Sequence, residues 1–212
     1  MEDLLARWDM RTFDEIRSDI NAAIDRNNAE ALWGLADEMQ ALETPNAHVA
    51  ALNSRGQAAA MTGNYPLALE HYRLALERYE EQDYRLGIAY IIGNIALVYA
   101  KTGDYPAALE HQNRALALYE ELGDQAEVAR VTGNMGTIYS YTGNYLLALE
   151  HYRRSKRVAM ELGDRSGEAA TTGNMGNVYR KIGDHGAALD HYRHALALHE
   201  QLGNRSSVAL VT

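Results

Sequence analysis

The chain has 212 residues, a formal net charge of −9 and no cysteine. Without cysteine it can form neither a disulfide framework nor a thiolate metal site. Residues 1–20 carry six acidic side chains and no apolar run, which excludes a secretory signal. No stretch approaches the roughly 18 apolar residues that a membrane span needs. We therefore expect a cytoplasmic protein with no membrane partner.

The charge is concentrated at the N-terminal end. Residues 1–46 contain 11 Asp or Glu and 4 Arg, a net charge of −7, whereas residues 47–212 contain 18 acidic and 16 basic side chains, a net charge of −2. Nucleic-acid binding needs a basic stripe to neutralise phosphates. The distribution therefore argues against nucleic acid as the main partner.

Residues 1–46 show helical patterning of their apolar side chains. Apolar residues recur at spacings of one to four over two stretches, Phe13, Ile16, Ile20 and Ile24, then Leu32, Trp33, Leu35, Met39 and Leu42. We predict an acidic helical N-terminal cap that ends at Thr44-Pro45, with Asn46 as the capping residue of the next helix. Its negative charge would suit a basic surface, so the cap could also fold back as an autoinhibitory ligand.

From about residue 47 the sequence repeats every 40 residues. A glycine, an alanine, a histidine and a tyrosine recur at fixed phases: Gly63, Gly103, Gly143 and Gly183; Ala68, Ala108, Ala148 and Ala188; His71, His111, His151 and His191; Tyr99, Tyr139 and Tyr179. A period of roughly 20 to 50 residues is typical of stacked units that bury apolar surface against their neighbours. The sequence therefore predicts an all-α solenoid, in which binding rather than catalysis is the default function.

Capping residues and helix breakers divide each repeat into two helices. Asp124 is suited to an N-cap, Gly143 and Gly163 to left-handed C-caps, and Pro66 and Pro106 to the first turn of a helix. The predicted first helices span 47–62, 84–102, 125–142 and 165–182, and the second helices span 65–81, 105–122, 145–162 and 185–202. Very short turns make neighbouring helices antiparallel.

These helices give four predicted repeats, 47–83, 84–123, 124–163 and 164–204. Residues 205–212 restart a first helix, so we expect the chain to be a fragment of a longer array whose uncapped end exposes Val208 and Leu210. Small residues also recur inside the helices, at Gly136, Gly176, Ala96, Ala108, Ala148 and Ala188. A glycine there costs about 1 kcal/mol relative to alanine, so its recurrence indicates close helix packing that a bulky side chain would disrupt.

The repeat resembles the tetratricopeptide repeat over about residues 47–212. Gly136, Tyr139, Ala148, Tyr152 and Ser155 match positions of that motif, although its usual unit has 34 residues. The strings 133–136 and 173–176, both Gly-Asn-Met-Gly, and the 40-residue period resemble a long-helix subclass found in Pins-like scaffolds and bacterial multidomain signalling proteins. The resemblance implies a right-handed superhelical solenoid of helix hairpins whose first helices line a concave peptide-binding groove.

Carried over by position, the resemblance assigns groove residues in three repeats. Asn94, Asn134 and Asn174 match an asparagine that binds the ligand backbone, and an amide can donate and accept without the desolvation cost of a charge. The other matching positions are Tyr90, Lys101, Arg130, Thr137, Tyr141, Asn177, Arg180 and Lys181. Several of these residues are basic, which implies a peptide ligand that is acidic or carries a free carboxylate. Lysines of the chaperone-binding clamp are absent, since Gly93, Gly133 and Gly173 stand there.

Several patterns have both a structural and a functional interpretation. The asparagines could instead bond neighbouring hairpins to each other. The histidine series lies on different hairpins and cannot share one ion, and His191 and His194 lack a third ligand, so we predict no metal site. Arg153, Arg154, Lys156 and Arg157 form either a solvated face or a docking patch. The Gly-Asn-Met-Gly strings lack the Lys-Ser/Thr ending of a phosphate loop.

The sequence therefore favours a non-catalytic protein-binding scaffold, without a cofactor, at the N-terminal end of a larger bacterial signalling protein linked to a cyclase or kinase. The main alternative is self-association, in which the uncapped C-terminal repeat face stacks on a second copy or exchanges helices with it. An enzymatic activity is a third hypothesis. The candidate Ser, His and Asp residues recur with the period and so belong to the scaffold.

Overall fold

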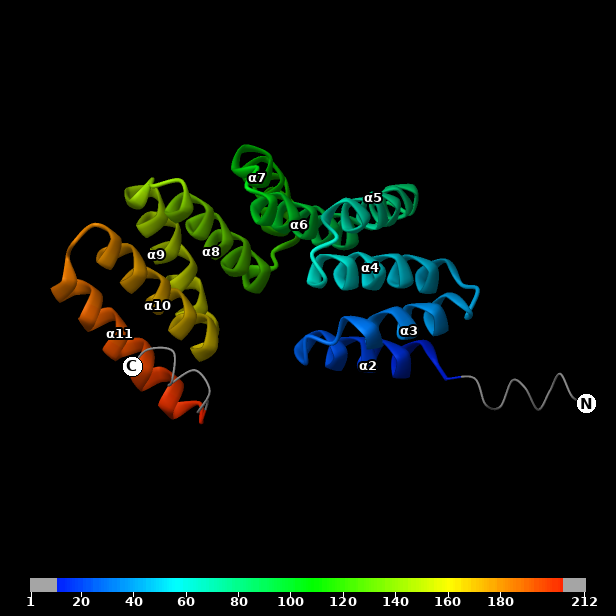
Figure 1. Cartoon of the computed structure of the whole chain (residues 1–212), viewed down its shortest axis with the longest axis horizontal. Helices are drawn as coiled ribbons and strands as arrows, with labels where there is room; N and C mark the ends of the chain where they lie inside the picture. The colour runs from blue at the N-terminus through cyan, green and yellow to red at the C-terminus, as the bar shows by residue number, and fades with distance from the viewer. Residues whose placement is uncertain (1–10, 204–212) are drawn as a thin grey trace, which may run out of the picture. The chain divides into compact units, whose positions relative to one another are not determined.

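The computed structural model describes residues 11–203, and every regular element in that range is an α-helix. Figure 1 shows consecutive helices running antiparallel. The helices are α2 (Phe13–Asp25), α3 (Ala29–Gln40), α4 (Pro45–Met61), α5 (Tyr65–Glu81), α6 (Arg85–Thr102), α7 (Tyr105–Leu122), α8 (Gln125–Tyr141), α9 (Tyr145–Leu162), α10 (Arg165–Lys181) and α11 (His185–Gln201). The predicted segment 205–212, with Val208 and Leu210, lies outside the described residues.

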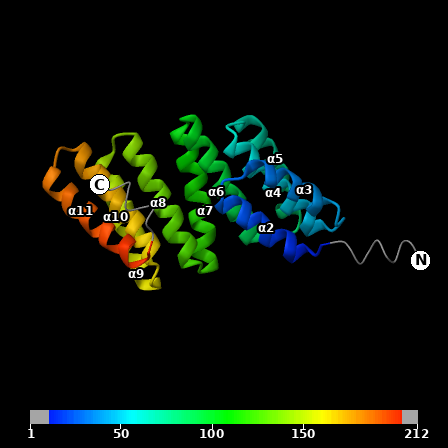
Figure 2. The same ribbon diagram turned by 60° about the horizontal axis from the view of Figure 1, so that its bottom comes forward.

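The chain divides into two compact units, Met1–Val98 and Tyr99–Thr212, with the division inside α6. In the first unit α3 packs against both α2 and α4, and α4 also packs against α5. In the second unit α8 contacts α7 and α9, and α10 contacts α9 and α11 (Figure 2). The first helices α8 and α10 also touch each other directly. Each unit is therefore a stack of antiparallel helix hairpins, as the 40-residue period predicts.

The predicted helix boundaries are confirmed to within one or two residues. Asp124 is the N-cap of α8, and its Oδ1 accepts a hydrogen bond from the backbone N–H of Glu127 at 3.1 Å. Gly143 and Gly163 have φ angles of +79° and +71°, the left-handed conformation that glycine adopts without a steric penalty. Pro66 lies in the first turn of its helix, where no N–H is needed.

The prediction that Thr44-Pro45 ends the N-terminal cap and that Asn46 caps the next helix is wrong. Thr44 is itself the N-cap of α4, and its Oγ1 accepts a hydrogen bond from the N–H of Ala47 at 3.2 Å. Pro45 is the first residue of the helix, because its fixed φ suits that position and its missing N–H would have no intrahelical partner there. Asn46 is already helical and exposed.

The recurrent helix glycines face tyrosine rings of the second helix in the same hairpin. A Cβ atom at Gly136 would lie 2.8 Å from Cδ1 of Tyr152, and one at Gly56 would lie 2.5 Å from Cε1 of Tyr72. Both tyrosines are buried. The close approach expected at these glycines therefore accommodates an aromatic ring.

Among the described residues, no helix combines the length and apolar character required to cross a bilayer.

Candidate functional site

The first helices of the second unit present a row of polar side chains that includes two of the predicted asparagines. Asn134 on α8 and Asn174 on α10 are half-buried, and their side chains form no hydrogen bond within the described part of the chain. Asn177, one turn after Asn174, is exposed and its Oδ1 accepts a hydrogen bond from the Tyr192 hydroxyl at 2.8 Å. The amides of Asn134 and Asn174 therefore retain their full capacity to donate and accept.

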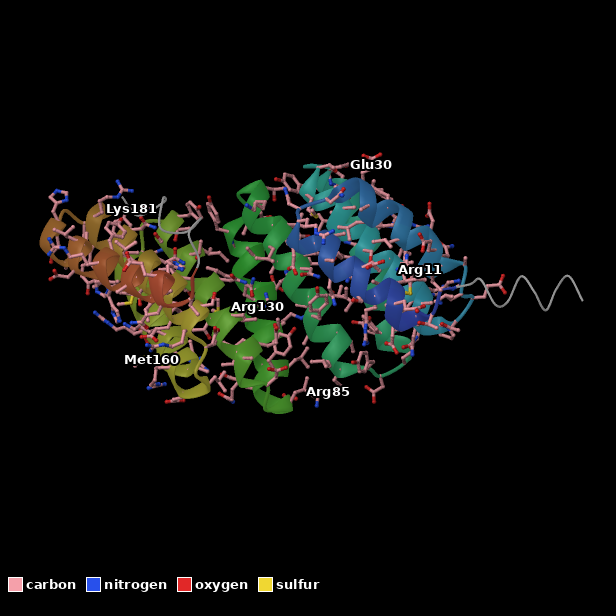
Figure 3. The ribbon with its side chains drawn as sticks, turned by 90° about the horizontal axis from the view of Figure 1, so that it is seen from below. Arg11, Glu30, Arg85, Arg130, Met160 and Lys181 are labelled. Atoms are coloured by element: carbon pink, nitrogen blue, oxygen red, sulfur yellow. The ribbon has the colours of Figure 1, made fainter. Side chains whose placement is uncertain are left out.

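Lys181 links the ends of the same two helices. Its Nζ donates to the carbonyl oxygen and to Oγ of Ser140, both at 3.1 Å, and lies 5.3 Å from the ring centroid of Tyr141. The ring of Tyr105 stacks on that of Tyr141, with the ring centroids 6.2 Å apart. Figure 3 shows Lys181 and Met160 at opposite ends of the unit's helices. A cation and an exposed aromatic ring thus meet at one end of the polar row.

Two further predicted groove residues bond within the scaffold. Nε of Arg130 donates to Glu127 at 2.7 Å; burial alone would lower the pKa of Arg130, but the hydrogen bond and charge of Glu127 raise it above its usual value. Thr137 donates to the carbonyl oxygen of Gly133 at 3.2 Å and lies 3.0 Å from the Tyr152 hydroxyl. Lys101 and Arg180 are exposed.

The predicted residues of the first unit bond to the neighbouring first helix. Asn94 on α6 donates its amide to Oδ1 of Asn53 on α4 at 3.3 Å, and Gln57 on α4 donates to the Tyr90 hydroxyl at 2.9 Å. Asn94 therefore follows the structural alternative, a bond between hairpins. Asn53 occupies the phase at which later repeats have glycine, so this pairing has no counterpart in them.

A cavity of about 640 Å³ lies in the first unit, beside these bonded pairs. Its floor is apolar, its rim carries four carboxamides and three tyrosines, and its one charged side chain is Arg17. The lining residues are Phe13, Arg17, Ile20, Asn21, Ile24, Met39, Asn46, Ala50, Asn53, Ser54, Tyr79, Gln82, Tyr84 and Tyr90. Of the predicted site residues, Tyr90 lies here. The other lining residues were missed because most belong to the cap or to positions where the repeat pattern is broken.

Tyr79 and Tyr84 form one wall of this cavity, with ring centroids 5.3 Å apart. Gly87 of α6 makes this wall possible, because a Cβ atom there would lie 2.6 Å from Cδ1 of Tyr84 and 2.8 Å from Cδ1 of Tyr79. Burial, and then the neighbouring Tyr84, raises the pKa of the Tyr79 hydroxyl, so it stays protonated as a donor. Tyr84 keeps nearly half of its surface exposed, at 48%.

The sequence profile of the tetratricopeptide repeat matches residues 48–121 and 127–201, which together make up more than half of the chain. The chain belongs to the tetratricopeptide repeat family. A search of curated protein sequences finds no match.

Solved structures share the tetratricopeptide repeat fold at low sequence identity. Aspartyl phosphate phosphatase F from Bacillus subtilis has a TM-score of 0.80 at 13% identity, over 91% of this chain and 52% of that one. PlcR from Bacillus thuringiensis, in complex with the peptide PapR7 and DNA, has a TM-score of 0.78 at 15% identity, over 94% and 73%. NprR in complex with its cognate peptide NprX has a TM-score of 0.68 at 22% identity, over 99% and 65%. These likenesses show the fold.

Three of the periodic histidines of the tetratricopeptide hairpins lie against a tyrosine ring of the preceding helix. The ring centroids of His111 and Tyr99 are 5.1 Å apart, as are those of His151 and Tyr139, and His191 and Tyr179 are 5.0 Å apart. The histidines are half-buried. In the described range, no three His, Asp or Glu side chains gather as a metal site would require.

The basic cluster on α9 is largely bonded within the scaffold. Arg154 pairs with Glu120 of α7, Arg157 lies 4.0 Å from Glu161, and Arg153 donates to the Tyr179 hydroxyl at 3.3 Å. Three of the four basic side chains thus form contacts within the second unit, whereas the predicted alternatives were a solvated face and a docking patch.

Proposed function

We propose that this chain is a non-catalytic interaction scaffold that binds an extended peptide, or a segment of a neighbouring domain, across the first helices of its second unit. One observation carries this proposal: Asn134 and Asn174, one period apart on touching helices, have half-buried amides with no hydrogen bond in the described part. Asn is a poor residue for a helix interior, so its recurrence there needs a reason. A peptide backbone offers the donor and the acceptor that each amide can use.

The solved structures of similar fold support a peptide as the partner. PlcR and NprR were each solved with a bound peptide. One similar structure is a phosphatase, but the chain spans only about half of that protein. A row of asparagines offers neither a nucleophile nor a base for catalysis, and we infer binding alone.

The cations of this face set the expected character of the peptide. Lys101, Arg180 and Lys181 are exposed on or at the ends of first helices, and Lys181 lies beside Tyr141. Such a face suits a peptide with acidic side chains or a free carboxylate, whereas the near-neutral repeat body suits nucleic acid poorly. The Bacillus proteins of similar fold support a bacterial origin. We place the chain in the cytoplasm, within a cyclase- or kinase-linked signalling protein.

Selection of binders from a random peptide library tests the proposal, followed by affinity measurements with synthetic peptides. The double variant Asn134→Ala, Asn174→Ala should weaken binding at least about tenfold, because two hydrogen bonds of about 1 kcal/mol each are lost. Asn113→Ala on α7 is the matched control, since Asn113 is exposed on a second helix. It should leave the affinity unchanged.

Two results would contradict the proposal. One is a set of peptides whose affinity is unaffected by the double variant, and the other is an equal loss in Asn113→Ala. Urea denaturation of each variant separates a loss of binding from a loss of folding. The self-association alternative rests on residues 205–212, outside the described part, and stays a prediction.

A further inference from the structure

Four of the residues that line the cavity of the first unit break the 40-residue pattern. Gln82 stands where the other repeats and the cap have Leu42, Leu122, Leu162 and Leu202. Tyr84 stands at the phase of Thr44, Asp124 and Asp164, each of which is the N-cap of its helix. Tyr90 replaces Ala50, Arg130 and Ala170, and Asn53 replaces Gly93, Gly133 and Gly173. All four of these replacements line one cavity.

The presence of Tyr84, in place of a capping Asp, makes the start of α6 less stable than the starts of α8 and α10. Asp124 and Asp164 each accept a hydrogen bond from the N–H three residues later, at 3.1 Å and 2.9 Å. Such a cap stabilises a helix by about 1 kcal/mol. A tyrosine cannot provide this carboxylate, and it leaves 48% of its own surface exposed beside the cavity. Tyr84 has a ring that packs on Tyr79 and lines the cavity in place of a helix cap, and positions that break a local rule are the expected places of a binding site.

The chemistry of the lining selects a ligand. The floor is formed by Phe13, Ile20, Ile24, Met39 and Ala50, so it accommodates an apolar group. The sole charged lining residue, Arg17, already pairs with Asp14 at 3.0 Å. A charged group entering the cavity would therefore lose its hydration without gaining an unpaired partner. Carboxamides and hydroxyls at the rim can each donate and accept, which matches a peptide backbone.

We infer that this cavity binds a large uncharged side chain, aliphatic or aromatic, of a peptide whose backbone is held by the carboxamides of Asn21, Asn46, Asn53 and Gln82. This inference rests on the proposed function and specifies one anchor of the peptide. It also refines the expected partner. The second unit offers cations for acidic groups, whereas the first unit takes an apolar residue. The volume of about 640 Å³ lies within the range of roughly 300–1,000 Å³ typical of small-ligand pockets.

Blocked tetrapeptides are the probes: Ac-Gly-Gly-Xaa-Gly-NH₂ with Leu, Trp, Asp or Lys at the third position. They are titrated to about 10 mM, a range that detects millimolar affinity, into the ¹⁵N-labelled full chain, and the side-chain amide resonances of Asn and Gln are followed by NMR. The Leu and Trp probes should shift the resonances of Asn21, Asn46, Asn53 and Gln82 in a saturable way. The Asp and Lys probes should bind at least tenfold more weakly.

Two variants give the matched comparison, because each replaces an exposed large side chain by the residue found at the same phase in other repeats. Tyr84→Asp places an Asp three residues before Gly87, as Asp164 stands three residues before Gly167 and caps α10. The variant should therefore gain a helix cap and fold at least as stably as the wild type. It should weaken binding of the Leu and Trp probes at least tenfold. Leu146→Pro, at an 86% exposed position of the second unit where other repeats have Pro66 and Pro106, should leave that binding unchanged.

The outcomes distinguish a failure of the cavity inference from a failure of the proposed function. Probes that shift Asn134 and Asn174 but not the four cavity amides would overturn the inference and leave the proposed function standing. Equal binding by wild type and Tyr84→Asp, or equal binding of charged and apolar probes, would also overturn it. So would the absence of any cavity shift at the highest probe concentration.

Discussion

The two units differ in how they form the left-handed residue between consecutive helices. In the second unit every described residue with a positive φ is a glycine, namely Gly103, Gly123, Gly143, Gly163, Gly183 and Gly203. The first unit uses glycine once, at Gly63, and otherwise places Asn27, Glu43 and Asp83 in this conformation, with φ angles of 52°, 52° and 50°. A side chain in the left-handed region costs energy that glycine avoids.

The difference distinguishes turn residues that serve helix packing from turn residues that lie beside the candidate binding cavity. The second unit keeps both the glycine and the following Asp cap at residues 123–124 and 163–164, which serves helix packing. In the first unit, Asp83 lies between Gln82 and Tyr84, and both of these line the cavity. We therefore expect departures from the regular repeat, as well as its recurring asparagines, to mark binding surfaces.

The largest effect is expected at the glycines that the two units share. Gly56→Ala and Gly136→Ala should each destabilise the fold by about 1–3 kcal/mol, because the new Cβ would overlap the buried ring of Tyr72 or Tyr152. Urea denaturation followed by circular dichroism measures the change in the free energy of unfolding.

A third glycine provides the control for this overlap. Gly173 is also inside a first helix, but a Cβ there would lie 3.9 Å from that of Ala195, an ordinary contact. Gly173→Ala should stabilise the fold by up to about 1 kcal/mol through helix propensity. If Gly136→Ala and Gly173→Ala change stability in the same direction, ring overlap does not explain why glycine recurs.

The next largest effect tests a departure inside the otherwise regular second unit. Gln112 stands at the phase of Tyr72, Tyr152 and Tyr192, and its repeat has Ala96 where the others have the helix glycine. Its side chain is fully buried, and neither amide atom has a hydrogen-bond partner. A buried unsatisfied amide costs about 1–3 kcal/mol.

Gln112→Met should therefore stabilise the fold by about 1–2 kcal/mol, since methionine fills a similar volume without polar atoms. The thermal midpoint and the urea midpoint measure it. Asn113→Met at the exposed neighbouring position should change stability by less than about 0.5 kcal/mol. A loss of stability in Gln112→Met would show that the amide is satisfied in solution.

A smaller effect is expected when the turn residues of the two units are exchanged. Gly163→Asp should destabilise the second unit by about 1 kcal/mol, because φ at this position is +71°. Asp83→Gly should stabilise the first unit by less than about 1 kcal/mol. The relief of the left-handed backbone is partly offset, because glycine increases the conformational entropy of the unfolded chain. Equal and opposite urea shifts would contradict that asymmetry.

The sequence predicts helix ends most accurately where a residue type is suited to a single backbone conformation. Pro66 and Gly143 mark helix ends because of fixed or left-handed backbone angles, and their helices begin and end as predicted. Pro45 was misread because a proline can follow one helix or begin the next, and the Oγ1 bond of Thr44 decides between these.

The candidate site was only partly predictable, because the period reveals which residues recur but not which ones meet. The period placed Asn94, Asn134 and Asn174 at one phase, yet only Asn94 has a hydrogen-bond partner, at Asn53. The cavity was missed because α2 carries no repeat signature and the remaining lining residues break the pattern. Comparing phases would have singled out Gln82 and Tyr84, but only the fold brings them beside α2.

The smallest effect concerns the periodic histidines, which both units possess. Burial is the main cause that lowers the pKa values of His71, His151 and His191. The folded state therefore takes up protons less readily than the unfolded state, in which histidine titrates near pH 6.5. The free energy of unfolding is therefore highest above pH 6.5, where these histidines are neutral in both states, and it decreases as the pH falls below that value.

The thermal midpoint should accordingly decrease as the pH is lowered from 7.5 to 5, and His151→Gln should have a flatter profile. Glu150→Gln should have a steeper one, because the Glu150 carboxylate raises the pKa of His151 against the effects of burial and of Arg154. If wild type and His151→Gln have the same slope, His151 binds its proton equally in both states. The stack on Tyr139 would then contribute packing but no pH dependence.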